Sequence, residues 1–378
     1  MTNTVTIPSN VLPEDGRFGS GPTKIRPEQI QALDKGRPYL LGTSHRQTPI
    51  KQVVGSIREG LSEFFQIPDG YEVVLGNGGA SAFWDIACAS LITRKAAFGT
   101  YGSFSSKFAK SAQSAPFLEE PEIFAGEPGT YRLPELTEYV DTYCWAHNET
   151  STGVAAPIKR IAGTKEQGAL TLIDATSGAG ALPVDISQTD ATISRRKKLS
   201  DPMADYGLPY SPPLQSNAPT ASPKAWIFRR TPLDSSVPFP DFGHRDSRKD
   251  QTLNTPAVAT LIMLENQVRW LNDNGGLAWL RPLRKVCVPA VPVGGEVRFA
   301  SPFVNDRNAR SNAVVTIDIN DGINASQVVA ALRENGIVDT NGYRKLGRNQ
   351  LRIGVFPSVE PSDVDALTRC IDYVVEHL

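Results

Sequence analysis

A glycine-rich turn and an aspartate are the first features of this 378-residue chain that could do chemistry. The turn, Gly76–Ser81 (GNGGAS), stands between an apolar run and a helical pattern. Free backbone N–H groups at the start of a helix bind anions such as phosphate, and Ser81 adds a hydroxyl donor. Asp174 follows the apolar run Leu170–Ile173, so we expect it at the carboxyl edge of a parallel sheet, where α/β enzymes place their sites. An ordinary glycine turn and a turn aspartate are the alternatives.

Basic and hydroxyl side chains are the other candidates. Arg46 carries a guanidinium fork, which binds carboxylates through paired hydrogen bonds. The segment Tyr343–Arg352 (YRKLGRNQLR) holds four basic residues, enough to bind a phosphate and a carboxylate. The Thr150 hydroxyl lies in a polar turn from which it could reach a cofactor, and Asn254 and Thr255 precede a helix whose N-terminus could bind phosphate. Solvated arginines, a plain turn and a helix cap at Thr255 explain the same patterns without a ligand.

The spacing of the apolar residues predicts the elements that position these groups. Short strands are predicted at 71–75, 95–98, 143–146 and 170–173, and helices at 27–35, 50–65, 80–91 and 105–112. Strands that alternate with helices over this length predict an α/β fold with a mostly parallel central sheet flanked by helices.

A second set of elements follows towards the C-terminus. The pattern predicts helices at 256–271, 326–335 and 362–378, and strands at 314–319 and 351–356. Ser362 and Asp365 have the spacing of a capping box at the start of the last helix. We therefore expect a large domain over residues 16–266 and a small C-terminal α/β domain over residues 267–378.

The composition is that of an ordinary soluble protein. The formal net charge is −1 and the sequence pI is about 6.5, which gives no general attraction to nucleic acid or to an anionic membrane. The chain starts without a secretion-signal pattern and has no apolar run long enough to span a membrane. The four cysteines and four histidines show no metal-binding spacing. We expect a cytoplasmic enzyme with small-molecule substrates and no metal, nucleic-acid or membrane partner.

Seven segments in a fixed order resemble the phosphoserine aminotransferase family, a class-V branch of the fold-type-I pyridoxal-phosphate enzymes. They are FGSGPTKIRPEQ, GTSHRQTP, GNGGASAFWD, WAHNETSTGV, LIDATSGAGALPVD, DSRKDQTLNTPAVATL and NGIVDTNGYRKLGRNQLRIGVFP. The resemblance covers residues 16–191, 246–280 and 301–378. It implies a large pyridoxal-phosphate-binding domain followed by a small C-terminal domain.

The resemblance implies an enzyme of serine biosynthesis with pyridoxal 5'-phosphate as cofactor. Such an enzyme transfers an amino group between L-glutamate and 3-phosphohydroxypyruvate, giving O-phospho-L-serine and 2-oxoglutarate. It is a homodimer with shared active sites, and a related phosphorylated keto acid would give it a role in pyridoxine synthesis. The main alternative is a class-V aminotransferase for alanine, serine or glyoxylate. The basic segment 343–352 argues against that alternative, because a small uncharged substrate needs no second anion site.

The resemblance also implies how the cofactor is bound. Ala80 and Ser81 would hold its phosphate, and Phe104 would stack on the pyridine ring. Thr150 would contact the phenolic side of the ring. Asp174 would bind the ring nitrogen and, with a lysine, carry the catalysis.

Further residues would complete a site shared between two subunits. Asn254 and Thr255 would reach the phosphate of the neighbouring subunit's cofactor. Arg46 would bind the carboxylate of glutamate, Arg352 the substrate α-carboxylate and Arg344 the phosphate of phosphoserine.

Residues 192–245 and 281–300 depart from the family pattern. The first segment holds nine of the 29 prolines, between Pro202 and Pro240, and lacks the Ser-Pro-Gln-Lys motif that contains the family's Schiff-base lysine. Codons begun one reading frame away can spell that motif and the glycine-rich turn after it. We therefore hypothesise compensated frameshifts in the gene or in its sequencing, and the second segment allows the same explanation. A catalytically dead homologue is then the alternative function.

Lys198 stands at the family's Schiff-base position when residues are counted from Asp174, and Lys197 replaces the glutamine before it. The resemblance therefore implies Lys198 as the catalytic lysine and places Lys197 beside the cofactor. A solvated residue in the basic run Arg195–Lys198 is the alternative for Lys198.

The frameshift hypothesis predicts that resequencing the gene across codons 185–250 restores the Ser-Pro-Gln-Lys motif. Peptide masses of the purified chain provide the independent check. An intact reading frame, together with peptide masses that match the present residues, would contradict the hypothesis.

Overall fold

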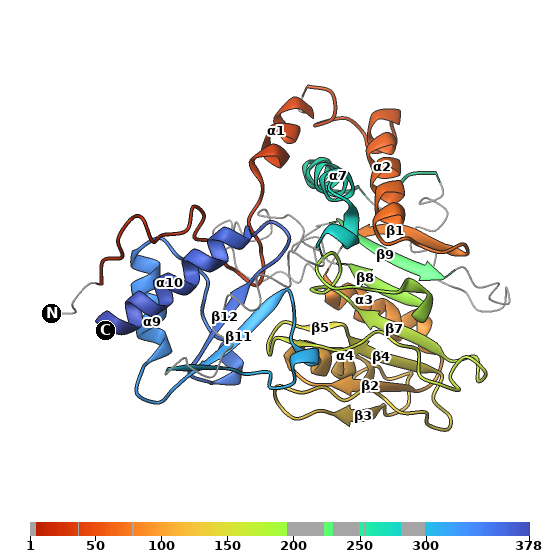
Figure 1. The fold of residues 1–378 in the computed structure, drawn as a ribbon. Helices are drawn as coiled ribbons and strands as arrows, with labels where there is room; N and C mark the ends of the chain where they lie inside the picture. The colour runs from red at the N-terminus through yellow and green to blue at the C-terminus, as the bar shows by residue number, and fades with distance from the viewer. Residues whose placement is uncertain are drawn as a thin grey trace, which may run out of the picture.

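The computed structural model describes residues 5–36, 38–77, 79–194, 249–252, 255–280 and 299–378, and the backbone of residues 223–229. Its largest element is a seven-stranded sheet (Figure 1). In spatial order its strands are β1 (Tyr71–Asn77), β9 (Pro223–Arg229), β8 (Ala191–Ser194), β7 (Leu170–Asp174), β4 (Thr142–Ala146), β2 (Ala96–Thr100) and β3 (Glu122–Ala125). Lys197, Lys198 and Asn254 lie outside the described residues.

The strand directions confirm the predicted α/β class. Strands β8, β7, β4, β2 and β3 pair in parallel, whereas β9 pairs antiparallel with both β8 and β1. One reversed strand therefore interrupts an otherwise parallel sheet. Because parallel strands present their carboxyl ends at one edge, the segments after β1, β2, β4 and β7 meet there.

Helices cover both faces of this sheet (Figure 1). They are α2 (Thr48–Phe64), α3 (Ala80–Ile86), the π-helical turn η1 (Ala87–Leu91), α4 (Ser103–Gln113) and α7 (Val258–Asp273). Helix α1 (Pro27–Gly36) packs on α7, where the Gln29 side-chain amide donates to the carbonyl of Met263. Helices α2 and α7 pack on one face together with Val73 and Leu75 of β1. Helices α3 and α4 pack on the other face with Val74. Successive residues of β1 are thus buried on opposite faces, as expected for a strand that is covered on both sides.

A smaller antiparallel sheet carries the C-terminal elements. Its members and neighbours are β10 (Ala300–Pro302), β11 (Val314–Ile319), β12 (Gln350–Gly354), α9 (Ala325–Glu334), α10 (Pro361–His377) and the short turn η4 (Arg344–Leu346). These elements share a hydrophobic core with the N-terminal segment, including Val5, Ile7 and Phe18. In the part of the chain that the structure describes, no helix is both long and apolar enough to cross a membrane.

The starts of two helices differ from the predictions. Helix α7 begins at Val258, so Thr255 is not its N-cap. Helix α10 begins at Pro361, and Ser362 and Asp365 do not cap it. The proline was the stronger signal there, because its fixed φ angle suits the first turn of a helix and its missing N–H is not needed at that position.

Strand β8 covers the start of the segment that departs from the family pattern. Ala191, Thr192 and Ile193 are buried, and β8 pairs with β7 on one side and β9 on the other. Strand β9 also falls within residues 192–245. This part of the sequence therefore contributes to two strands of the main sheet.

A buried ion pair fixes the entry to β8. The Asp190 carboxylate accepts a hydrogen bond from Nη1 of Arg160 at 2.6 Å and from the backbone N–H of Thr171, in β7, at 2.8 Å. The Arg160 and Asp190 side chains are only 13% and 6% exposed, so water screens the pair little. Removing one charge would leave the other largely buried without its opposite charge.

We therefore expect Asp190→Asn to lower the free energy of unfolding by about 3–5 kcal/mol, the usual effect of breaking a buried pair. Urea denaturation measures this change. The matched control is Glu135→Gln, which breaks the exposed Arg132–Glu135 pair and should change the free energy by about 0–1 kcal/mol. Equal effects of the two substitutions would show that burial of the Asp190 pair does not matter.

Candidate active site

A cavity of about 380 Å³ lies at the carboxyl edge of the main sheet. It is lined by the segments that follow β1, β2, β4 and β7, by an N-terminal segment and by the C-terminal sheet. The lining residues are Ser20, Gly21, Pro22, Gly79, Ala80, Ser81, Trp84, Phe104, Lys107, Asn148, Thr150, Asp174, Thr176, Ser177, Tyr343 and Arg352. The fold therefore brings together six of the residues that the sequence singled out: Ala80, Ser81, Phe104, Thr150, Asp174 and Arg352.

Asp174 is the last residue of β7 and is only 4% exposed. One carboxylate oxygen, Oδ1, accepts the backbone N–H of Thr176 at 2.9 Å, and the other, Oδ2, accepts the indole Nε1–H of Trp84 at 2.9 Å. Burying a carboxylate is costly unless hydrogen bonds or an opposite charge compensate it. The two donors fix the orientation of the carboxylate, which can also pair with a cationic group in the cavity.

The Thr150 hydroxyl belongs to a small network of side chains. Its Oγ1 donates to Oγ of Ser177 at 2.9 Å, and Oγ of Ser177 donates to the backbone carbonyl of Asn148 at 2.8 Å. The amide Nδ2 of Asn148 lies 3.0 Å from Oγ of Ser177. All three residues are buried, so the network holds the segments after β4 and β7 in one arrangement.

Two helices begin at this edge, and a carboxylate covers the start of only one of them. At α4, the backbone N–H groups of Phe104 and Ser105 donate to Glu149 at 3.0 and 2.8 Å. At α3, no side chain among the described residues caps the helix. Ala80 and Ser81 lie in the first turn of α3 and line the cavity. The start of α3 is therefore the favoured position for an anionic group.

Aromatic and cationic side chains form one wall of the cavity. The rings of Phe104 and Tyr343 lie 6.1 Å apart between centroids, and the Lys107 ammonium lies 5.2 Å from the Phe104 ring. The Arg352 guanidinium lies 5.3 Å from the Tyr343 ring, and its Nη1 donates to the carbonyl of Thr150 at 3.2 Å. Burial lowers the pKa of Arg352 from its usual range, although a guanidinium stays charged at neutral pH.

Arg344 lies in an adjacent cavity of about 590 Å³, together with Lys345 and Arg348. Tyr343 and Arg352 line both cavities and form the wall between them. The basic side chains of the segment 343–352 are thus divided between two cavities. Arg352 lines the 380 Å³ cavity, and Arg344, Lys345 and Arg348 line the 590 Å³ cavity.

The other predicted residues lie elsewhere. Arg46 and Thr255 are exposed, and neither lines the first cavity. Lys197, Lys198 and Asn254 fall outside the described part of the chain.

Sequence reasoning assigned no role to Trp84, Asn148, Ser177 or Tyr343, which also line the cavity. Each lies within a segment that resembles the family, so the segments themselves were the available signal. In the sequence Trp84 cannot be told from an ordinary buried aromatic residue on a helix. Its partner Asp174 is 90 residues away along the chain, so no local pattern links the two.

Several buried polar atoms in this cavity have no hydrogen-bond partner within the described residues. They are Ser20 Oγ, Asn148 Oδ1, Thr176 Oγ1 and Arg352 Nε. Buried polar groups are normally paired, so these atoms mark a place for a polar ligand. Together with the Asp174 carboxylate, the Phe104 ring and the start of α3, they fit a flat heteroaromatic ring that carries a basic nitrogen, a hydroxyl and a phosphate. Pyridoxal phosphate has these groups.

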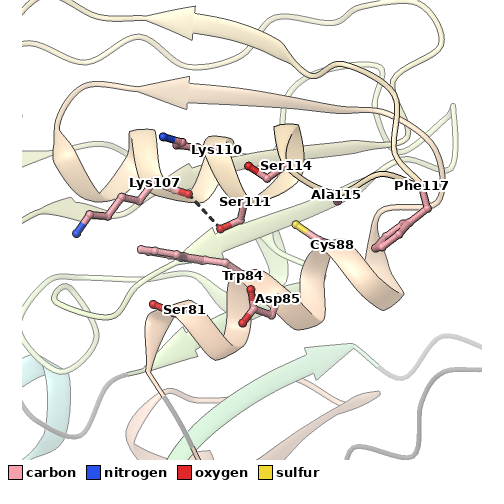
Figure 2. Close-up of a pocket in the computed structure, with 10 residues that line it drawn as sticks. All are labelled: Ser81, Trp84, Asp85, Cys88, Lys107, Lys110, Ser111, Ser114, Ala115 and Phe117. Carbon is pink, nitrogen blue, oxygen red and sulfur yellow. Dashed lines mark hydrogen bonds between the residues drawn. The ribbon is translucent and has the colours of Figure 1, made fainter. Parts of the chain in front are cut away.

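A groove of about 570 Å³ between α3 and α4 adjoins the cavity and shares Ser81, Trp84 and Lys107 with it (Figure 2). The Trp84 indole extends between the two helices and stacks on Phe108 with ring centroids 5.9 Å apart. Trp84 therefore packs α3 against α4 with its ring while its N–H holds Asp174. Burial raises the pKa of the nearby Cys88 to about 11, so this thiol is not a nucleophile at neutral pH.

His147 follows β4 and is a buried histidine with an unpaired ring nitrogen. Its Nδ1 has no hydrogen-bond partner within the described ranges. A Cβ atom at position 178 would lie 2.6 Å from this nitrogen, so glycine at 178 leaves the room that the ring needs. Burial lowers the pKa of His147 to about 4, and the ring is neutral at physiological pH.

The depressed pKa of His147 makes the stability of the fold depend on pH. The unfolded chain takes up a proton near pH 6.5 and the folded chain only near pH 4, so stability falls as the pH drops through this window. Between pH 7.5 and pH 5 this group should lower the free energy of unfolding by roughly 2 kcal/mol. We expect His147→Gln to lose about 2 kcal/mol less of its free energy of unfolding between pH 7.5 and pH 5 than the wild-type protein does. Urea denaturation at the two pH values measures both losses. The same pH dependence in both proteins would contradict the assignment.

Comparison with known proteins shows which family this chain resembles in sequence and in fold. The family description "Aminotransferase class-V" matches residues 18–202. The phosphoserine aminotransferase of a Nocardioides species is 47% identical over 382 residues, which cover all of both chains. Among solved structures, a phosphoserine aminotransferase from Cytophaga hutchinsonii has a TM-score of 0.77 with 18% identity, covering 95% of this chain and 99% of that one. A PLP-bound phosphoserine aminotransferase from Trichomonas vaginalis has a TM-score of 0.74 with 16% identity, covering 95% and 100%.

The two kinds of comparison agree. The solved structures share the fold, and the full-length identity to the Nocardioides protein is well above the level at which a family is shared. This chain belongs to the phosphoserine aminotransferase family of the class-V aminotransferases.

Proposed function

We propose that this chain is a phosphoserine aminotransferase that uses pyridoxal 5'-phosphate. It transfers an amino group between L-glutamate and 3-phosphohydroxypyruvate, and the products are O-phospho-L-serine and 2-oxoglutarate. The observation that carries the proposal is the buried Asp174 carboxylate, held by Trp84 in the same cavity as Arg352. The full-length identity to a phosphoserine aminotransferase supports it.

Asp174 would pair with the ring nitrogen of the cofactor and hold a proton on it. When bound, pyridoxal phosphate supplies an electron-accepting ring next to the α-carbon of the amino acid. The Trp84 and Thr176 N–H groups keep the carboxylate in place for this contact. The Phe104 ring would cover one face of the cofactor, and the Thr150 hydroxyl would contact its phenolic oxygen.

The cofactor phosphate would lie at the start of α3. Ala80 and Ser81 offer backbone N–H groups in the first helical turn, and Ser81 adds its hydroxyl. The absence of a side-chain cap among the described residues of this helix start supports the assignment.

Arg352 would bind the substrate α-carboxylate, and Arg344 would bind the substrate phosphate. Arg352 is anchored by its hydrogen bond to the carbonyl of Thr150, which leaves other N–H groups of the guanidinium for a carboxylate. Arg344 and Lys345 line the neighbouring cavity, which shares the Arg352 wall. Adjacent anion sites support a substrate with two anionic ends over alanine or serine.

The complete site would need a second copy of the chain and the catalytic lysine. Asn254 and Thr255 would contact the cofactor phosphate of the neighbouring subunit. The exposure of Thr255, and its position outside the cavity of its own chain, support this role. Arg46 would bind the carboxylate of glutamate, and Lys198 would bind the cofactor covalently, with Lys197 beside it.

The same proposal includes the organisation of the molecule. Residues 16–266 would form the cofactor-binding domain and residues 267–378 the small domain. The enzyme would be a homodimer with shared active sites in the cytoplasm, acting on small molecules without a nucleic-acid or membrane partner.

We expect Arg344→Gln to lower kcat/KM for phosphoserine about tenfold or more, because a hydrogen bond to a charged group contributes roughly 1.5–3 kcal/mol. The value for serine, which lacks the phosphate, should change little, so the preference for phosphoserine should fall. Steady-state kinetics with both amino donors measure this ratio.

The matched control is Asp174→Asn, which should lower kcat/KM for both donors alike because it acts on the cofactor. Two outcomes would contradict the proposed function. One is a wild-type protein that uses serine as well as phosphoserine, and the other is a protein that stays colourless after pyridoxal phosphate is added.

A further inference from the structure

Glu149, in the short strand β5 (Asn148–Glu149), is a fully buried carboxylate with five donors around it. It accepts the backbone N–H groups of Phe104 at 3.0 Å, Ser105 at 2.8 Å and Ser151 at 3.2 Å. It also accepts the hydroxyl groups of Ser105 at 2.9 Å and Ser151 at 2.7 Å. Charge-assisted hydrogen bonds of this kind offset the cost of removing a carboxylate from water.

The start of α4 is built around this carboxylate. The N-cap residue is Gly102, which has no side chain to cap the helix. A Cβ atom at position 102 would lie 2.3 Å from Cγ of Glu149 and 2.5 Å from its Cδ. Glycine at this position therefore leaves the space that the carboxylate fills. The cap of α4 comes instead from residues 149–151, since Oγ of Ser151 also accepts the backbone N–H of Ser103 at 3.0 Å.

The residues next to these contacts line the candidate active site. The Phe104 backbone is held by Glu149, and the Phe104 side chain lies in the cavity. Thr150 follows Glu149 directly, lines the cavity with its side chain and accepts Arg352 at its carbonyl. One carboxylate thus connects the aromatic wall, the hydroxyl network and the substrate arginine.

We propose that Glu149 is a positioning residue of the aminotransferase site. It holds the Phe104 backbone, so that the Phe104 ring would cover the cofactor. It also holds the segment of Thr150, whose carbonyl accepts Arg352, so that Arg352 would face the substrate. It lies behind these groups and acts through them, without touching cofactor or substrate. Its charge also occupies the start of α4, so the cofactor phosphate is directed to the start of α3. This inference rests on the proposed function.

Asp141 provides a matched control for a purely structural role. Its carboxylate accepts the backbone N–H groups of Thr93 at 3.2 Å, Arg94 at 2.7 Å and Lys95 at 3.0 Å. It therefore collects backbone donors as Glu149 does, but it lines neither cavity described above. Replacing either carboxylate by its amide removes one acceptor oxygen and lowers stability in the same way.

The experiment compares Glu149→Gln with Asp141→Asn in the full-length protein. Cofactor binding is measured by the quenching of tryptophan fluorescence as pyridoxal phosphate is added, and by the circular dichroism of the bound cofactor in the visible range. Because small displacements at an active site are costly, we expect the Kd for pyridoxal phosphate to rise about tenfold in Glu149→Gln and the visible dichroism to change. The KM for phosphoserine should rise as well. In Asp141→Asn only the unfolding temperature should fall.

The two variants distinguish a positioning role of Glu149 from a purely structural one. If the two variants lose similar stability and both keep the wild-type Kd, KM and dichroism, Glu149 is structural only and the inference is wrong. If Glu149→Gln does not fold, Ser151→Ala takes its place, because it removes only the hydroxyl between Glu149 and the Ser103 N–H. It should shift the Kd in the same direction by about threefold, and an unchanged Kd would overturn the inference. A wild-type protein that does not bind pyridoxal phosphate would instead refute the proposed function and this inference with it.

Discussion

The site depends on a carboxylate that is kept out of water at the end of a parallel strand. Asp174 is almost fully buried, and the donors from Trp84 and Thr176 hold both of its oxygens. These hydrogen bonds offset part of the cost of burying the carboxylate, and a cationic group in the cavity would offset more of it. The arrangement is therefore suited to a ligand with a basic nitrogen.

The topology of the sheet explains how distant residues meet around this carboxylate. Strands β1, β2, β4 and β7 end at one edge, and each contributes a loop to the cavity. The C-terminal sheet completes it, because the Arg352 side chain reaches the carbonyl of Thr150 across the boundary between the two sheets. A change in the packing of the C-terminal elements would therefore move Tyr343 and Arg352 relative to the rest of the cavity.

Charge decides how the two helix starts at this edge are used. The first backbone N–H groups of any helix have no partner within the helix, so both starts would attract an anion. Glu149 neutralises the start of α4 from within the protein, and Gly102 gives it the space to do so. The start of α3 has no such side chain within the described residues and stays open to an anionic group. An internal carboxylate thus makes the two helix starts unequal as sites for an anion.

Much of this protein could be read from its sequence, because the signals were local. Apolar runs marked β1, β2, β4 and β7, and the family segments indicated Asp174, Phe104 and Arg352. Only the tertiary structure decided the roles of Trp84, Glu149 and Tyr343, since each depends on a partner far away in the chain. It also decided that residues 192–194 belong to strand β8 of the main sheet. The physical reason is the same throughout: periodicity and turn chemistry are properties of neighbouring residues, whereas hydrogen bonds in a buried site join side chains that only the fold brings together.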